Sequence, residues 1–153
     1  MEAHVIECPS PMGPFWMQAR DDALVAAGWR RLSGAGPVPL LEEAAGQVAA
    51  YFDGRLTRFD LPCRVEVGGI VPQVCALMQA IPFGQTRTYG DLARDLSKPA
   101  QAIGQACGRN PIPLIIPCHR VLGASGLGGF SAAGGVETKV ALLRIEGAAG
   151  LLI

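Results

Sequence analysis

The chain has 153 residues, and its 13 basic and 13 acidic side chains give a formal net charge of zero near neutral pH. Half of the residues are hydrophobic, which is enough for the core of one ordinary domain without disulfide bonds. The apolar runs are too short to span a bilayer and the N-terminus does not resemble a signal peptide, so we expect a cytoplasmic protein without a membrane segment.

The cysteines and histidines indicate neither a disulfide framework nor a metal site. The five cysteines are odd in number and irregularly spaced, there is no CxxC pair, and the only histidines are His4 and His119. A tetrahedral zinc site needs more ligands than His4 and Cys8 supply. We therefore expect free thiols, which suit a reducing compartment, and no metal.

Charge is distributed unevenly along the chain. Residues 1–70 carry six basic and nine acidic side chains, whereas residues 71–128 carry five basic and two acidic ones, a net charge of +3. The five basic residues are Arg87, Arg94, Lys98, Arg109 and Arg120. This asymmetry allows one face to meet phosphates, although solvated basic faces are more common than binding surfaces.

The first part of the chain has the pattern of a small sheet followed by a helix. Residues 4–9, 13–19 and 23–29 are short apolar segments separated by turn residues, which predicts antiparallel strands. The spacing of apolar residues in 39–54, "PLLEEAAGQVAAYFDG", predicts an amphipathic helix that ends at Gly54. An irregular or extended crossing follows over residues 58–69, and the composition changes after it. We expect one unit over residues 1–68 and a second over residues 69–153.

The second unit has a mainly helical pattern. A helix is predicted from Val71 onward, with Cys75 on its apolar face, so Cys75 and Cys107 are better explained as core residues than as chemistry. A helix-turn-helix follows over residues 88–111: Thr88 caps the first helix with Asp91 three residues on, and Pro99 begins the second.

The second of these helices is lined with small residues, namely Ala100, Ala102, Gly104 and Ala106. Close packing of the two helices is the favoured explanation. The alternative is that small residues let the helix approach a nucleic-acid groove. The helix is short and poor in arginine, which is not typical of a major-groove reader.

The segment "NPIPLIIPCHRVLG", residues 110–123, presents a thiol, an imidazole and a guanidinium in succession. We predict that the apolar run 114–116 is a strand-like support that carries Cys118. A thiol is a nucleophile only as thiolate, so its pKa must be lowered by a positive or hydrogen-bonding neighbour. Adjacent side chains of an extended segment point to opposite faces, so His119 would reach Cys118 only through a local turn or a bridging water.

A partner for His119 is available at the end of the last predicted helix, "ETKVALLRIEG". Glu146 there lies just before a terminating glycine, at the unfavourable end of the helix dipole. This position slightly favours a buried partner for Glu146 over solvent, and an imidazole that acts as a base needs an orienting acid.

The motif "IPCHRV" resembles the active-site signature of the O6-alkylguanine–DNA alkyltransferases. The stretches "IPFGQTRTYGDLA", "GRNPIPLIIPCHRVLGASG", "GGFS" and "ETKVALLRIEG" are similar to that family in order and spacing, and "SPMGPFWMQA" and "YFDGRLTRFDLP" resemble its N-terminal part. The resemblance implies an α+β fold. Its first unit would be a ribonuclease-H-like subdomain, and its second a helical subdomain with a winged-helix-like helix-turn-helix.

The resemblance also implies a mechanism. A damaged guanine is flipped out of the DNA, and Cys118 takes its O6-alkyl group in one irreversible displacement without a cofactor. His119 would act as base through a water, and Glu146 would orient it. Asn110 would tie the turn before the active site, and Tyr89 would assist the leaving base.

Substrate and DNA binding are assigned, on the same resemblance, to residues of the helix-turn-helix and of the active-site loops. These residues are Gln101, Ala102, Arg109, Arg120, Val121, Phe130 and Ser131. The expected partner is double-stranded DNA that contains O6-alkylguanine, bound by a monomer that associates with the nucleoid.

Two positions depart from the family pattern. Gln101 stands where the family usually has an arginine that fills the space left by the flipped base, and glutamine lacks that charge and planar stacking. The segment 128–139 is longer and richer in Ala and Gly than in many relatives. We expect slower base flipping with an intact chemical step.

Three other functions remain open on the sequence. A non-enzymatic sensor of alkylated DNA resembles this chain, but such sensors replace the cysteine. A cysteine hydrolase built on Cys118, His119 and Glu146 lacks a hydrolase signature around it. A plain helix-turn-helix regulator would have no use for the nucleophile.

Overall fold

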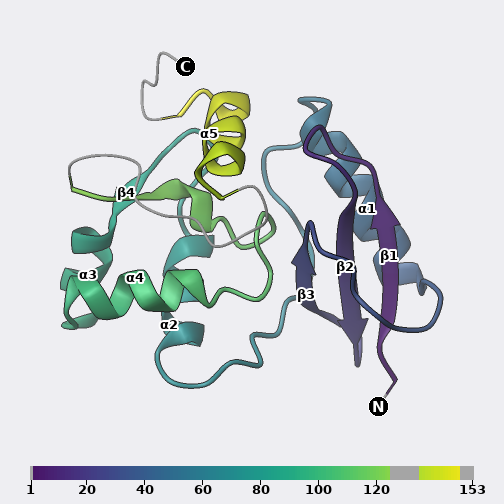
Figure 1. Cartoon of the computed structure of the whole chain (residues 1–153), viewed down its shortest axis with the longest axis horizontal. Coiled ribbons are helices and arrows are strands. Elements are labelled where there is room, and N and C mark those ends of the chain that lie inside the picture. Colours follow the sequence, from purple (N-terminus) through teal and green to yellow (C-terminus); the bar gives the residue numbers. More distant parts are fainter. Residues whose placement is uncertain (1, 125–134, 149–153) are drawn as a thin grey trace.

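The computed structural model describes residues 2–124 and 135–148, and it has a mixed α/β fold. Strands and helices are segregated: a three-stranded sheet with helix α1 forms one side of the molecule, and the remaining helices form the other (Figure 1). Within the described residues, no helix is long and apolar enough to cross a membrane.

The sheet is antiparallel and follows the chain order β1 (His4–Cys8), β2 (Phe15–Arg20) and β3 (Ala23–Gly28). Burial alternates along β2, where Phe15, Met17 and Ala19 face the core. Asp21 and Asp22 join β2 to β3 with positive φ angles of 51° and 62°, as a hairpin turn of type I′ requires. The predicted antiparallel strands are confirmed.

Helix α1 (Pro39–Phe52) packs against β1 and β2. Its buried residues, Leu41, Ala44, Val48 and Tyr51, recur at the spacing of one helix face. Gly54 lies two residues beyond its end with φ +76°, a conformation that glycine adopts without a steric penalty. The predicted helix and its stop are therefore confirmed.

The C-terminal part contains four helices among the described residues. They are α2 (Val71–Gln79), α3 (Tyr89–Leu96), α4 (Ala100–Gly108) and α5 (Gly135–Glu146). Two short strands, β4 (Arg87–Thr88) and β5 (Val121–Leu122), pair in parallel, and the sequence pattern did not predict them. Ser97 ends α3 in the left-handed region, and Pro99 is the N-cap of α4.

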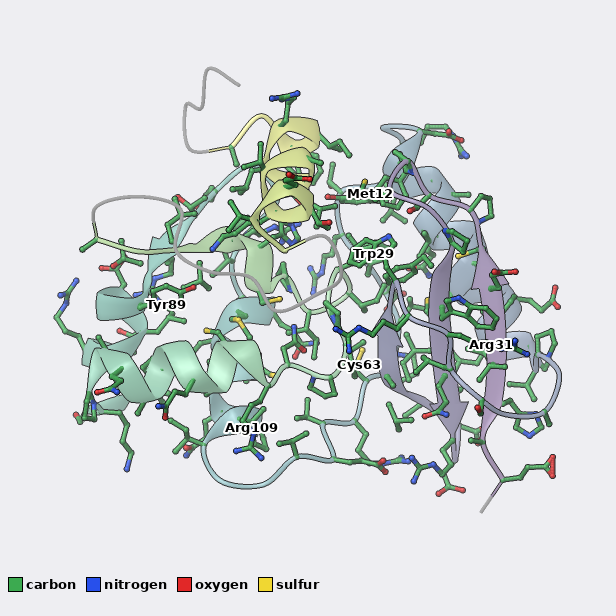
Figure 2. All side chains as sticks on the ribbon, in the orientation of Figure 1. Met12, Trp29, Arg31, Cys63, Tyr89 and Arg109 are labelled. Carbon is green, nitrogen blue, oxygen red and sulfur yellow. The ribbon has the colours of Figure 1, made fainter. Side chains whose placement is uncertain are left out.

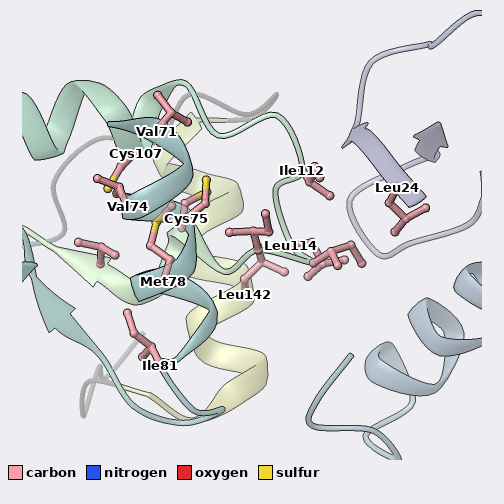
Figure 3. Packing of buried hydrophobic residues seen from close by; sticks show 14 of the residues in the cluster. Leu24, Val71, Val74, Cys75, Met78, Ile81, Cys107, Ile112, Leu114 and Leu142 are labelled. Carbon is pink, nitrogen blue, oxygen red and sulfur yellow. The ribbon is translucent and has the colours of Figure 1, made fainter. Parts of the chain in front are cut away.

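One continuous core joins the two parts of the molecule. Figure 3 shows Ile112 and Leu114 between α2 and the strand that carries Leu24, and all three side chains are fully buried. The backbone N–H of Ala27 in β3 also donates to the carbonyl of Pro111 over 2.9 Å. The segment that leads into the active-site motif is therefore packed against the sheet.

The N-terminus of α3 has the capping box expected from Thr88 and Asp91. The Thr88 hydroxyl accepts from the backbone N–H of Asp91 over 3.0 Å, and the Asp91 carboxylate accepts from the N–H of Thr88 over 2.9 Å. Two of the orphan donors at this helix end are thereby satisfied.

Replacing Thr88 by alanine should therefore lower the free energy of unfolding by about 1 kcal/mol, because the first turn of α3 loses its side-chain acceptor. Chemical denaturation measures this change. Thr88→Ser keeps the hydroxyl and should remain close to the parent, and an equal loss in both variants would contradict a capping effect.

Candidate active site

The segment that carries Cys118 is a closed turn and not the strand-like support that the sequence suggested. Asn110 holds the turn: its side-chain N–H donates to the carbonyl of Ile116 over 2.9 Å, and its side-chain oxygen accepts from the N–H of Ile112 over 3.0 Å. The N–H of Ile116 also donates to the carbonyl of Ile112 over 2.9 Å. Asn110 therefore ties the backbone of residues 112–116 just before Cys118.

Proline explains why this apolar run does not pair as a strand. Pro111, Pro113 and Pro117 lack the N–H donors that a strand ladder needs. Leu114, in the middle of the turn, has φ +73°, which costs a branched residue on the order of 1 kcal/mol. The side chain of Leu114 is fully buried, and its packing with the hydrogen bonds of Asn110 keeps the backbone in this conformation.

Cys118 begins a short 3-10 helix (Cys118–Arg120) and is buried. Burial raises the pKa of its thiol to about 11, although a hydrogen bond with Asn110 and the charge of Lys139 act in the opposite direction. The thiol is therefore protonated at rest near neutral pH, and reaction requires a nearby group that removes its proton.

His119 contacts Glu146 across the molecule. Its Nε2 lies 2.7 Å from Oε2 of Glu146, and both side chains are fully inaccessible to solvent. The 3-10 turn at 118–120 directs the side chain of His119 into the interior, where it is fully buried. The orienting acid anticipated at position 146 is therefore in contact with the imidazole.

Glu146 accepts four hydrogen bonds from three residues. Besides His119, Arg120 donates through Nε over 2.8 Å and through Nη2 over 3.0 Å, and the hydroxyl of Tyr51 donates over 2.7 Å. Burial alone would raise the pKa of Glu146, but these donors lower it to about 2. The carboxylate therefore stays ionised.

These contacts fix the protonation state of His119. Burial lowers the pKa of the imidazole, against the opposing effect of Glu146, so the ring is neutral near neutral pH. Because Glu146 is an ionised acceptor, the ring proton is on Nε2, and Nδ1 is left with its lone pair. Among the described residues, this buried Nδ1 has no hydrogen-bond partner.

Arg120 does not lie on the surface where a DNA contact would be made. Its side chain is 8% exposed, and it binds Glu146 and the carbonyl of Ile81. The structure thus gives this guanidinium a place inside the reactive centre, contrary to its assignment to DNA binding from the sequence. The buried acid would be costly without this cation.

Lys139 is a buried cation that the sequence analysis missed. Its ammonium donates to the carbonyl of Val121 over 2.7 Å and lies 5.8 Å from the centre of the Tyr89 ring. Burial lowers the pKa of Lys139, while negative charge on Cys118 would raise it. Lys139 therefore lies near Val121, Tyr89 and Cys118, three residues that the sequence analysis had singled out separately.

The signal for Lys139 was present in the sequence. Lys139 lies three and seven residues before Leu142 and Glu146, so the three side chains share one face of α5, and all are buried. A lysine on the apolar face of a helix is uncommon enough to mark a site. No comparable signal identified Tyr51 as the partner of Glu146, because the two residues are 95 positions apart.

Helix α4 presents part of its small-residue surface to solvent. Ile103, Ala106 and Cys107 are buried, whereas a methyl group added at Gly104 or Gly108 would meet nothing within 4 Å. The buried Ala106 fits the expected packing of α4 against α3, whereas Gly104 and Gly108 lie where that packing requires no small residue. Their positions favour the alternative, a surface that another molecule can approach closely.

The remaining predicted DNA contacts lie near this surface. Gln101 and Arg109 are exposed and Ala102 is half-buried, and Figure 2 shows Arg109 at the end of α4 and Tyr89 at the start of α3. Phe130 and Ser131 lie outside the described residues.

The positive surface is smaller than the sequence count implies. Arg87 pairs with Asp95 over 2.8 Å and Arg94 pairs with Asp91, while Arg120 is internal. Lys98 and Arg109 are both exposed.

The buried ion pair predicts a specific pH dependence of stability. The pKa of Glu146 is lower in the folded than in the unfolded protein, so its contribution is present above about pH 4.5 and is lost as the pH falls toward 2. Glu146→Gln should cost about 3 kcal/mol near neutral pH and flatten the acid dependence. Denaturation measured between about pH 7 and pH 3 tests this.

Glu137→Gln is the matched control, because this acid is exposed in the first turn of the same helix. It should retain the acid dependence of the parent. An unchanged slope in Glu146→Gln would contradict the ionised buried carboxylate.

Comparison with known proteins places this centre in a family. Residues 71–148 match the family model described as "6-O-methylguanine DNA methyltransferase, DNA binding domain". A methylated-DNA–protein-cysteine methyltransferase from Methanosarcina acetivorans is 36% identical over 149 residues, which cover 90% of this chain and 94% of that protein. A protein of the same name from Mycobacterium leprae is 35% identical over 94% of this chain and 92% of its own length.

Solved structures give the same result. Mycobacterium tuberculosis OGT in complex with DNA superposes with a TM-score of 0.84 and 36% sequence identity, covering 94% of this chain and 92% of that one. The family model matches residues 71–148, and the relatives match nearly the whole chain. This chain belongs to the methylated-DNA–protein-cysteine methyltransferase family.

Proposed function

We propose that this chain repairs DNA by transferring the alkyl group of an O6-alkylguanine to its own Cys118, in a single irreversible turnover. The observation that carries the proposal is a buried thiol followed, in the next residue, by a neutral imidazole that Glu146 orients. The DNA-bound relative supports DNA as the partner.

The chemical step is one displacement at a saturated carbon. The sulfur of Cys118 forms a bond to the alkyl carbon as the bond from that carbon to O6 breaks, and the electron pair leaves with guanine. A soft thiolate suits this carbon, and the thioether product is not reversed by thiol exchange. The protein is consumed in the reaction, and no cofactor enters it.

The proton of Cys118 needs an acceptor, because the pKa of the buried thiol is about 11. Nδ1 of His119 supplies the lone pair and takes the proton through a water molecule. Glu146 stabilises the imidazolium that forms, since its carboxylate already accepts Nε2–H. Tyr89 donates a hydrogen bond to the ring edge of the leaving guanine.

The flipped guanine is bound on the side of Cys118 that Lys139 and Tyr89 approach. Val121 and Ser131 contribute backbone groups and Phe130 contributes its ring. Lys139 keeps the backbone at Val121 in place and adds positive charge near the developing thiolate.

Helix α4 is the element that approaches DNA. Its exposed glycine positions allow a close approach, Arg109 and Lys98 contact phosphates, and Ala102 packs near the backbone. Gln101, exposed in the first turn, enters the base stack in place of the flipped guanine.

The division of the fold is part of the same proposal. Residues 1–68 form a ribonuclease-H-like subdomain, and residues 69–153 form an alkyl-acceptor subdomain with a winged-helix-like helix-turn-helix. The sheet with α1 and the later helices support this division. The protein acts as a monomer on O6-alkylguanine, in the cytoplasm at the nucleoid.

A damage sensor that binds without repairing is the main competing function. It has no need of a thiol, whereas here Asn110 hydrogen-bonds Cys118 and the next residue, His119, is oriented by Glu146. A hydrolase and a plain regulator have less support, because the surface of α4 and the thiol are both explained by alkyl transfer.

Incubation with a duplex that contains O6-methylguanine should add the mass of one methylene group to the intact protein, on Cys118 alone. Mass spectrometry with peptide mapping measures this, and Cys118→Ala should gain no mass while still binding the duplex. Cys8→Ala is the control, because that buried thiol lies at the end of β1 in the N-terminal sheet and should leave the transfer intact. Binding without a mass change in the parent would favour the sensor.

Gln101→Arg should speed repair of methylated duplex about tenfold, the effect of lowering the cost of base flipping by ~1.4 kcal/mol. Single-turnover rates with the duplex and with free O6-benzylguanine, which needs no flipping, separate the two steps. The free base should react at the rate of the parent.

Gln105→Arg is the matched control, since Gln105 is also exposed and lies one helical turn further along the same face. It adds the same charge and should not reproduce the gain. Equal acceleration by both substitutions would attribute the effect to charge alone.

A further inference from the structure

Among the described residues, Tyr51 is the one residue of the N-terminal part that donates a hydrogen bond to the carboxylate of Glu146. It lies near the end of α1, and its hydroxyl donates to Oε2 of Glu146 over 2.7 Å. The side chain is 1% exposed. Nothing in the mechanism set out above uses this hydrogen bond.

Aromatic neighbours hold the Tyr51 ring in place. It stacks on Phe59 with ring centres 5.4 Å apart, and the rings of Phe52 and Phe83 meet it edge-on at 5.0 and 6.1 Å. Burial and the adjacent Glu146 raise the pKa of Tyr51 far above its ordinary range. The hydroxyl is therefore a donor at every pH at which the protein functions.

We propose that Tyr51 is a positioning residue for alkyl transfer. Its hydrogen bond to Glu146 sets the strength of the hydrogen bond that Glu146 accepts from Nε2 of His119. The inference rests on the proposed function, because it assumes that His119 accepts the proton of Cys118. It assigns a part in the chemistry to the N-terminal unit, which otherwise contributes no residue to the centre.

Hydrogen-bond donors crowd Oε2 of Glu146. That atom accepts from Tyr51, His119 and Arg120, so its charge is shared among three donors. Removing one donor leaves more charge for the others and strengthens the hydrogen bond to Nε2 of His119. The imidazolium form of His119 is then more stable.

Other charged groups lie near His119 and Glu146, and the variant used in the test must leave them unaltered. Arg120 is close to Glu146 and His119, and Lys139 on α5 also acts on His119 by its charge. Cys118 faces Lys139 from the 3-10 helix. Tyr51→Phe removes one oxygen atom and leaves each of these groups in place.

The test is the pH dependence of single-turnover methyl transfer by Tyr51→Phe. His119 must be neutral to accept a proton, so the rate falls on the acid side as His119 becomes protonated. We expect this fall to move to higher pH by about half a unit in the variant, a roughly threefold loss of rate there.

Gln47→Leu is the matched control. Gln47 lies one turn earlier on α1 and bonds the backbone of Asp60 through both ends of its amide, outside the reactive centre. Its loss weakens the same helix without touching Glu146. The same acid shift in both variants, or in neither, would overturn the inference.

A second measurement does not depend on activity. The chain has only two histidines, so NMR of histidine-labelled protein gives two imidazole spectra, with His4 as the internal reference. The Nε2 proton of His119 should move downfield in Tyr51→Phe at neutral pH, and an unchanged signal would contradict the proposal. If the parent transfers no methyl group, the proposed function fails, whereas this signal still tests the contact.

Discussion

Four hydrogen bonds from two distant parts of the chain, Tyr51 and the adjacent His119 and Arg120, meet at the buried carboxylate of Glu146. A carboxylate remains ionised in the protein interior only when a cation and further hydrogen-bond donors compensate for its lost hydration. Arg120 supplies the cation and Tyr51 a further donor. The consequence reaches the chemistry: with Glu146 ionised, the proton of His119 must be on Nε2, and Nδ1 becomes the acceptor. The reactive centre depends on this single group.

A second constraint holds the nucleophile itself. Asn110 closes a proline-rich turn and lies beside Cys118, so one side chain both shapes the backbone and favours the thiolate. The turn packs against β3 through Pro111 and against the core through Leu114. A strained backbone conformation of this kind persists only where the surrounding packing and hydrogen bonds hold it in place. The rigid turn in consequence fixes the orientation of the Cys118 thiol.

The sequence predicted most elements, because their signals are local. The strands, α1 and the capped start of α3 followed from periodicity, glycine and the Thr88–Asp91 pair. The prediction of a strand-like support at residues 114–116 was wrong, because it gave the apolar character of the run more weight than the three prolines around it. Arg120 was assigned to DNA binding on the family resemblance, and only its ion pair with Glu146 in the folded chain shows that it is internal.

The sequence by itself determined which chemistry is available, since the thiol, the imidazole, the acid and the asparagine lie in motifs whose order is specific to one family. Tertiary structure decided how they act together. Burial sets the pKa of Cys118 and of His119, and burial is a property of the folded chain and not of a motif. The contact of Tyr51 with Glu146 joins residues 95 positions apart, and no local pattern encodes a partner at that distance.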